Sequence, residues 1–129
     1  MLNIDNKEEY LRYSANSKES SNSRYHAAIY VIETSIKENN SSSVEVIKRI
    51  GNCLSELEKL PMDIEFRKND LFLLIKTVEW SLVNQTSLGA AKILKRSTGI
   101  GVVDDEFLNL NAEQKKLLCK KWSDAIEKL

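Results

Sequence analysis

The chain is poor in the residues that break helices and build tight turns. Its 129 residues include one proline and four glycines, which leaves little material for the hairpin turns of a β-rich fold. Apolar residues recur instead at intervals of three and four, the spacing of one face of a helix. The sequence therefore predicts an all-α fold, with helices joined by links rich in serine and asparagine.

Residues that carry catalysis and cofactor binding are also scarce. A single histidine excludes a two-histidine zinc motif. The chain contains no GxSxG elbow, no Walker A loop and no GxGxxG fingerprint, and Gly99-Ile100-Gly101 is only a bare GxG. We therefore expect a protein that is not an enzyme and has no catalytic residues, no cofactor and no metal site.

Net charge is absent as well, because 19 basic and 19 acidic side chains cancel. This balance removes the general attraction to nucleic acids and anionic membranes that a strongly basic protein has. The apolar run at residues 71–75 is far shorter than the roughly 20 residues of a membrane span. The N-terminal residues are acidic where a signal peptide is basic, and the two cysteines form no CxxC motif. These features predict a cytoplasmic protein with no membrane partner.

Helix-start signals and apolar spacing divide the chain into six helical segments. Their expected starts are Asp5, Asn22 or Ser23, Ser42, about residue 70, Ser87 and Asn111. The third segment ends before Pro61, the fourth near residue 85 and the fifth at Gly99. Residues 61–69 fit either an extended piece or a helical turn. We predict a compact bundle of five to six helices that forms a single domain over residues 1–129.

Two segments have the composition of links. Residues 14–23 are rich in serine and asparagine, whose side chains compete for backbone hydrogen bonds, and we predict a loop there. Residues 99–109 begin with a glycine suited to end a helix, and we predict a connector before the last helix. Within it, the acids at 104–106 fit the start of a short helix, whose N-terminal end favours negative charge.

The four tyrosines all lie in the first 30 residues. Tyrosine combines a large contact area with a polar group and is enriched at protein interfaces. On the second expected helix, His26, Tyr30 and Glu33 lie opposite the apolar stripe. We predict a protein-binding face that comprises Tyr10, Tyr13, His26, Tyr30 and Glu33, with Asp104, Asp105 and Glu106 contacting a basic partner. The alternative is purely structural: Tyr25 belongs to the core, Tyr10 and Tyr13 half-bury the first helix, and Tyr30 is an isolated ring on the surface.

Three features together favour a protein–protein interaction module. They are the absence of catalytic motifs, the clustering of the tyrosines, and the separation of acidic and basic residues into blocks along the sequence. The specific kinds that we consider are a bacterial immunity protein or antitoxin-type toxin inhibitor, and an assembly subunit. The expected helix near residues 70–85 is apolar nearly all round, which fits a homodimer contact and equally fits a central position in the bundle.

The main alternative is a helical RNA- or DNA-binding subunit. Basic residues form short ridges on the last two long helices, and Lys116 and Lys120 are one helical turn apart. The full set is Lys92, Lys95, Arg96, Lys115, Lys116, Lys120 and Lys121. Such ridges can pair with phosphates. The simpler interpretation is a solvated surface, with the acids at 104–106 folded back on the lysines.

A third function follows only from a resemblance. The segment Ser23-Arg24-Tyr25-His26-Ala27-Ala28 resembles a helix of HEPN-type helical ribonucleases, which implies a metal-free ribonuclease built around Arg24 and His26. In that family the catalytic arginine and histidine are several residues apart on a later helix. Side chains two residues apart on a helix also point roughly 200° away from each other. We therefore rank a ribonuclease last.

Overall fold

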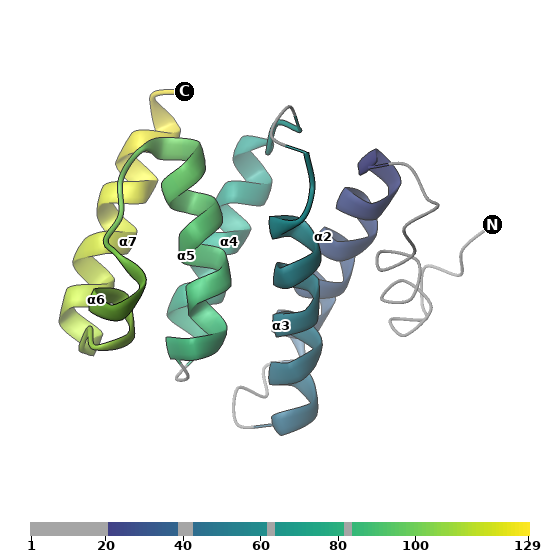
Figure 1. Cartoon of the computed structure of the whole chain (residues 1–129), viewed down its shortest axis with the longest axis horizontal. Helices are drawn as coiled ribbons and strands as arrows, with labels where there is room; N and C mark the ends of the chain where they lie inside the picture. The colour runs from purple at the N-terminus through teal and green to yellow at the C-terminus, as the bar shows by residue number, and fades with distance from the viewer. Residues whose placement is uncertain (1–20, 39–42, 62–63, 82–83) are drawn as a thin grey trace. The chain divides into compact units, whose positions relative to one another are not determined.

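A computed structural model describes residues 21–38, 43–61, 64–81 and 84–129 (Figure 1). The described residues contain six helices and no strand, which confirms the all-α fold. The expected first helix, with Tyr10 and Tyr13, lies outside these residues. The chain divides into two compact units, residues 1–65 and residues 66–129. A single domain over the whole chain stays a prediction.

The first unit packs α2 (Ser21–Lys37) against α3 (Val44–Glu58). Two residues of the apolar stripes that the sequence predicts, Ile36 and Ile47, are half-buried, and the others are buried. The buried ones are Tyr25, Ala28, Ile29 and Ile32 on α2, and Val46, Ile50, Cys53, Leu54, Leu57 and the following Leu60 along α3. A further buried stripe on α2 comprises Ala27, Val31 and Ser35. The sequence pattern missed it because small and polar residues add little to an apolar periodicity.

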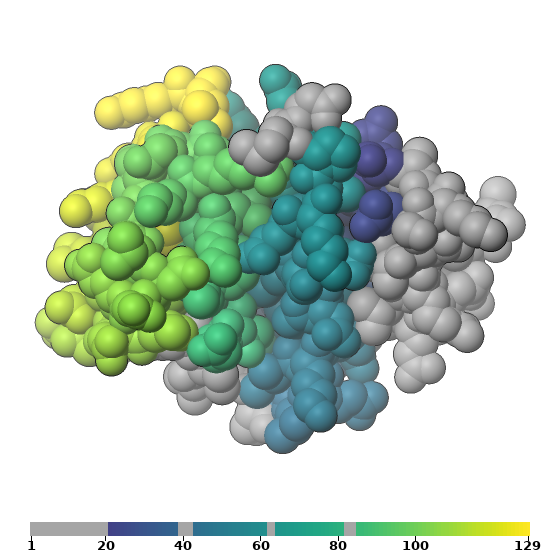
Figure 2. All heavy atoms as spheres, viewed as in Figure 1, coloured from purple at the N-terminus to yellow at the C-terminus, as the bar shows by residue number. Residues whose placement is uncertain are grey.

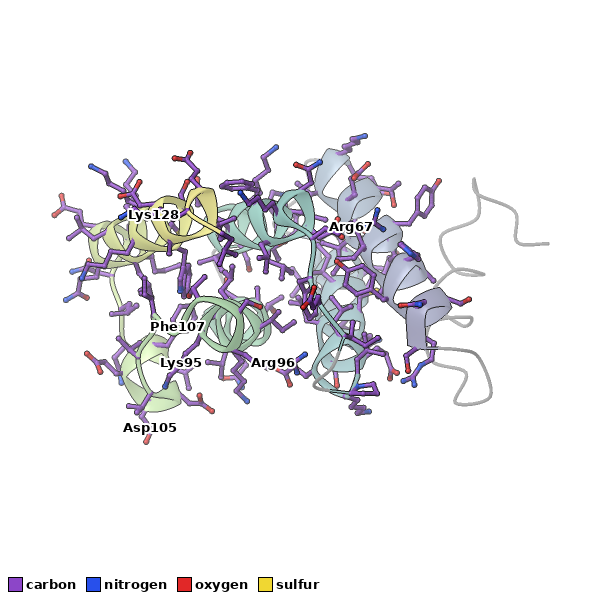
Figure 3. The ribbon with its side chains drawn as sticks, turned by 90° about the horizontal axis from the view of Figure 1, so that it is seen from above. Arg67, Lys95, Arg96, Asp105, Phe107 and Lys128 are labelled. Carbon is purple, nitrogen blue, oxygen red and sulfur yellow. The ribbon has the colours of Figure 1, made fainter. Side chains whose placement is uncertain are left out.

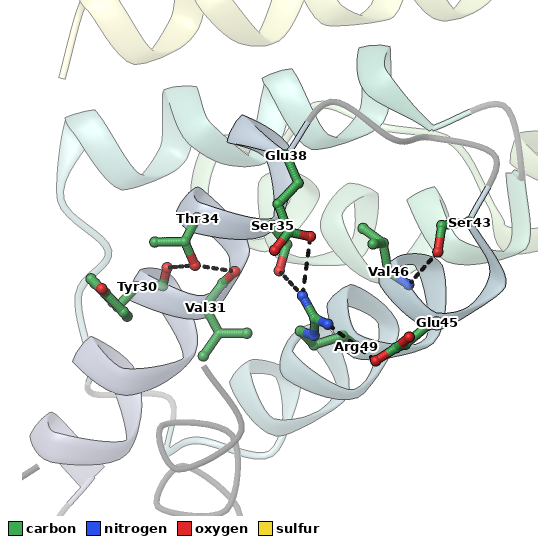
Figure 4. A network of polar contacts seen from close by, with 9 residues as sticks. All are labelled: Tyr30, Val31, Thr34, Ser35, Glu38, Ser43, Glu45, Val46 and Arg49. Carbon is green, nitrogen blue, oxygen red and sulfur yellow. Dashed lines mark hydrogen bonds and ion pairs between the residues drawn. The ribbon is translucent and has the colours of Figure 1, made fainter. Parts of the chain in front are cut away.

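Polar contacts hold these two helices in register. Arg49 on α3 donates to the Ser35 hydroxyl at 3.4 Å and to the Glu38 carboxylate at 3.3 Å, and it also lies 3.5 Å from Glu45 (Figure 4). Arg24 on α2 donates to Glu56 on α3 at 3.1 Å. Because each arginine bridges the two helices, sliding one helix along the other would break several charged contacts at once.

The second unit contains α4 (Lys68–Trp80), α5 (Asn84–Thr98), α6 (Asp104–Leu108) and α7 (Ala112–Glu127). Helix α4 packs against both α5 and α7, as expected for a central element, and α6 packs on α5 (Figures 1 and 3). The buried core draws on all four helices and includes Leu74, Val78, Leu94, Phe107, Trp122 and Ile126.

Helices α4 and α7 run antiparallel. Lys68 at the start of α4 donates to the Glu127 carbonyl at the end of α7, at 3.5 Å. At the other end, Lys115 on α7 donates to the Ser81 carbonyl just after α4, at 3.1 Å. This arrangement brings the last turn of α4 next to the first half of α7. No helix in the described segments is long and apolar enough to span a membrane.

Several predicted boundaries are wrong by a few residues. Residues 21–23 form the first turn of α2 rather than the end of a loop over 14–23, because serine and asparagine are also favoured where a helix begins. Helix α3 is capped by Ser43, not Ser42, and residues 64–67 are neither helix nor strand. Ser87 lies buried inside α5, which begins at Asn84.

The fourth helix also ends earlier than predicted. Its last residue is Trp80 rather than a residue near 85, and Ser81 has an extended backbone with ψ of 128°. Apolar residues continue beyond Trp80 in the sequence, so periodicity alone does not mark this end.

The connector at 99–109 is ordered by local contacts. Gly99 ends α5 with a positive φ of 77°, as its position predicts. The indole N–H of Trp122 donates to the Ile100 carbonyl at 2.6 Å and holds the connector on α7. The acids at 104–106 form the first turn of α6, and Asn111 and Gln114 form the predicted capping box of α7. The connector is therefore fixed at both ends.

Candidate interaction surfaces

The outward strip of α2 carries three of the residues expected to bind a partner. His26 and Glu33 are exposed and Tyr30 is half-buried. Glu33 forms an ion pair with Lys37 at 3.3 Å, and the His26 ring meets Tyr25 edge-on, with centroids 5.4 Å apart. The structure thus keeps His26, Tyr30 and Glu33 together on one strip. The other two expected members, Tyr10 and Tyr13, lie outside the described residues.

Arg24 and His26 have different surroundings, although they are close in sequence. Arg24 lies mostly buried between α2 and α3, where its guanidinium pairs with Glu56. His26 is exposed on the outer side of α2. The structure therefore does not bring these two side chains to one site, and Arg24 has a structural role in joining the helices.

The acidic residues of α6 project from the second unit. Asp104 pairs with Lys92 on α5 at 3.4 Å, so this acid does fold back on a lysine. Asp105 and Glu106 are exposed, and Asp105 points away from α5 (Figure 3). In the space-filling view α5 and α6 form a continuous surface (Figure 2). This surface combines both signs of charge.

Three of the seven basic residues of the nucleic-acid alternative have contacts within the second unit. Lys92 pairs with Asp104, and the Arg96 guanidinium lies 5.7 Å from the centre of the Phe66 ring. Lys115 donates to the Ser81 carbonyl, and burial lowers the pKa of this lysine. The other four members, Lys95 on α5 and Lys116, Lys120 and Lys121 on α7, are exposed. They therefore come from two different helices.

A hollow lies between α4 and α7, and the sequence reasoning did not anticipate it. Its volume is about 300 Å³, and it is lined by Glu79, Lys116, Cys119, Lys120, Ser123 and Asp124. The α7 residues follow helical spacing, but Glu79 joins them only through the antiparallel packing of α4 and α7. No local sequence signal indicates that packing.

Neither cysteine has the lowered pKa that is typical of a reactive thiol. Burial raises the pKa of the Cys53 thiol to about 12 and that of Cys119 to about 11. A thiolate is the reactive form of cysteine, so neither side chain is suited to nucleophilic chemistry at neutral pH. In the described part of the chain, no three histidine, cysteine, aspartate or glutamate side chains cluster in a way that could hold a metal ion.

Comparison with known proteins finds no matching family model, no matching curated protein and no matching solved structure.

Proposed function

We propose that this chain is a non-enzymatic module that binds another protein. The observation that carries the proposal is the outward strip of α2, where exposed His26 and Glu33 flank a half-buried Tyr30. A half-buried tyrosine offers a rigid apolar ring that is already partly ordered, so less side-chain entropy is lost on binding. Polar and charged neighbours around such a ring add specificity more than affinity.

The proposed partner is a protein whose surface complements this strip. The exposed acids Asp105 and Glu106 on α6 form a second contact for a partner with basic side chains. The finer parts of the proposal are a cytoplasmic location and a role as an immunity or antitoxin-type inhibitor of a toxin, or as an assembly subunit, with a homodimer as a further possibility. These parts rest on the sequence.

The test is capture of a partner from native lysate by matched variants. The chain is immobilised as wild type, as His26→Ala, as Glu33→Ala and as the control Lys48→Ala, an exposed lysine on α3. We expect one protein to bind to the wild type and to the control. The α2 variants should bind it about 1–2 kcal/mol more weakly, while their circular dichroism stays unchanged. Equal capture by all four chains would contradict the proposal.

An RNA- or DNA-binding subunit is the alternative, and it is less well supported. Contacts within the second unit engage Lys92, Arg96 and Lys115, which leaves four exposed lysines on two helices. Nucleic-acid affinity would fall steeply with salt, with a slope near −0.9 per neutralised duplex phosphate. Titration with duplex DNA and with RNA between about 50 and about 200 mM salt tests this. Undetectable binding at the lower concentration would eliminate the alternative.

A further inference from the structure

The outer face of α7 carries an exposed apolar side chain among charges. Leu117 is 63% exposed, whereas the next residue, Leu118, is buried in the core. On a helix, Leu117 neighbours the residues three and four positions later, Lys120 and Lys121, and the residue seven positions later, Asp124. Figure 3 shows side chains that end in nitrogen or oxygen projecting from α7. Leu117 is thus an exposed apolar side chain surrounded by charged residues.

The hollow between α4 and α7 adjoins this surface and holds both signs of charge. Lys116, Lys120 and Asp124 follow one another at successive turns of α7, and Glu79 faces them from α4. None of these four side chains has a hydrogen-bond or ion-pair partner among the described residues. Opposite charges that share a hollow without pairing are available for a ligand that carries both signs.

We propose that Leu117 and the α4–α7 hollow together bind an amphipathic helix of a partner protein. That helix places an apolar side chain on Leu117, acidic side chains opposite Lys116 and Lys120, and a basic side chain opposite Asp124. Glu79 contacts a further basic group of the same helix. The inference rests on the proposed protein-binding function but uses a surface on α7, separate from the α2 strip.

The spacing of the charges favours a helix as the occupant. Four residues of a helix rise about 6 Å, so acidic, acidic and basic residues at successive turns match Lys116, Lys120 and Asp124. A helix also satisfies its own backbone hydrogen bonds. An extended segment would need backbone partners, and side chains line this hollow. The hollow is also lined mainly by charged and polar side chains, whereas small-molecule sites are mostly apolar.

The test uses a designed peptide, so it does not depend on identifying the natural partner. The probe is an alanine-rich helical peptide of about 15 residues with Glu, Glu and Lys at successive turns and one leucine. A second peptide has Lys, Lys and Glu at the same positions. Each is titrated into the isotope-labelled full chain, and amide chemical shifts are followed by NMR.

We expect the first peptide to shift amides of α7 and of the last turn of α4, and the charge-reversed peptide to bind at least about fivefold more weakly. Leu117→Ala should weaken binding of the first peptide by a similar factor. Val44→Ala is the matched control, because Val44 is 66% exposed on α3 in the other unit, and it should bind like the wild type.

Equal binding of the two peptides would overturn the inference, as would shifts centred on other helices. Unchanged affinity in Leu117→Ala would also overturn it. The α2 strip is tested separately by His26→Ala and Glu33→Ala. Failure of the peptide titration alone therefore rejects the α7 surface and leaves the proposed function standing.

Discussion

At the scale of single residues, the charged side chains that are most shielded from solvent stabilise the packing of α2 against α3. Arg24 and Glu56 are about 15% and 17% exposed and join α2 to α3 at 3.1 Å. Arg49 is similarly shielded and reaches three acceptors. Such part-buried pairs are costly to break, because a shielded charge loses an opposite charge close to it. Exposed pairs contribute little by comparison.

This contrast predicts different costs for two glutamate substitutions on α3. Glu56→Ala leaves the shielded Arg24 without its carboxylate, and we expect it to lower the free energy of unfolding by about 1–3 kcal/mol. Glu45→Ala removes a carboxylate that is 78% exposed and should cost less than about 0.5 kcal/mol. Urea denaturation of both variants measures the difference. Equal losses would show that shielding does not decide the strength of these pairs.

The buried thiol of Cys53 predicts a loss of stability at high pH. Burial raises its pKa to about 12, Arg49 opposes the rise and Glu56 adds to it. The unfolded thiol loses its proton above about pH 9 while the folded thiol keeps it, so alkaline pH favours unfolding. This contribution to stability is fully present below about pH 9 and is lost as pH rises toward about 12, at up to about 1.4 kcal/mol per pH unit.

The comparison of wild type with Cys53→Ala isolates this contribution, because the other titrating groups are common to both chains. The difference between their unfolding free energies should shrink as pH rises from about 8 to about 10.5. Urea denaturation across this range measures it. Parallel pH profiles for the two chains would contradict the assignment.

Helical periodicity alone predicts which residues of a candidate surface share a face. His26, Tyr30 and Glu33 lie on one strip of α2 because they repeat every three to four residues. The same reasoning cannot predict contacts between helices. The sequence suggested that the acids at 104–106 fold back on lysines, but it did not identify Lys92 as the partner of Asp104. The approach of Glu79 to the α7 lysines depends on packing that no local pattern encodes.

At the scale of helices and turns, the end of a helix is predictable from sequence where the residue found there suits that position and no other. Gly99 has a positive φ and ends α5, and Asn111 and Gln114 satisfy each other's backbone N–H groups at the start of α7. The start of α5 was not predictable from Ser87, because serine fits both a cap and a buried helix position. In the structure Ser87 is buried, and its hydroxyl has no hydrogen-bond partner among the described residues.

Two glycine substitutions should have opposite effects on stability. An added Cβ meets nothing within 4 Å at Gly51 or at Gly99, so only the backbone distinguishes them. Gly51 lies inside α3, and Gly51→Ala should stabilise by about 0.5–1 kcal/mol. Gly99 has φ of 77°, and Gly99→Ala should destabilise by about 1–2 kcal/mol. Thermal unfolding of both variants measures the signs, and the same sign for both would contradict this account.

At the scale of the whole molecule, the aromatic residues provide a separate probe for each unit. All four tyrosines lie in residues 1–65, and both tryptophans, Trp80 and Trp122, lie in residues 66–129. Near-ultraviolet circular dichroism at tyrosine and tryptophan wavelengths therefore follows the units separately. The single-domain prediction requires coincident unfolding transitions. Two separate midpoints would show instead that the units are independent domains.

The zero net charge also has a consequence at this scale. Neutrality removes a general attraction to polyanions, while the units display local patches of both signs on α6, α7 and the α2 strip. Patterned charge of this kind selects partners by complementarity, which is the basis for proposing a protein partner rather than a nucleic acid.

The most direct test of the protein-binding claim is capture from native lysate with and without prior nuclease treatment. The account predicts that the wild-type chain retains one protein after nuclease treatment, and that a chain carrying both His26→Ala and Glu33→Ala loses it while keeping its fold. Bound material that consists of nucleic acid, or a protein that is lost after nuclease treatment, would contradict it.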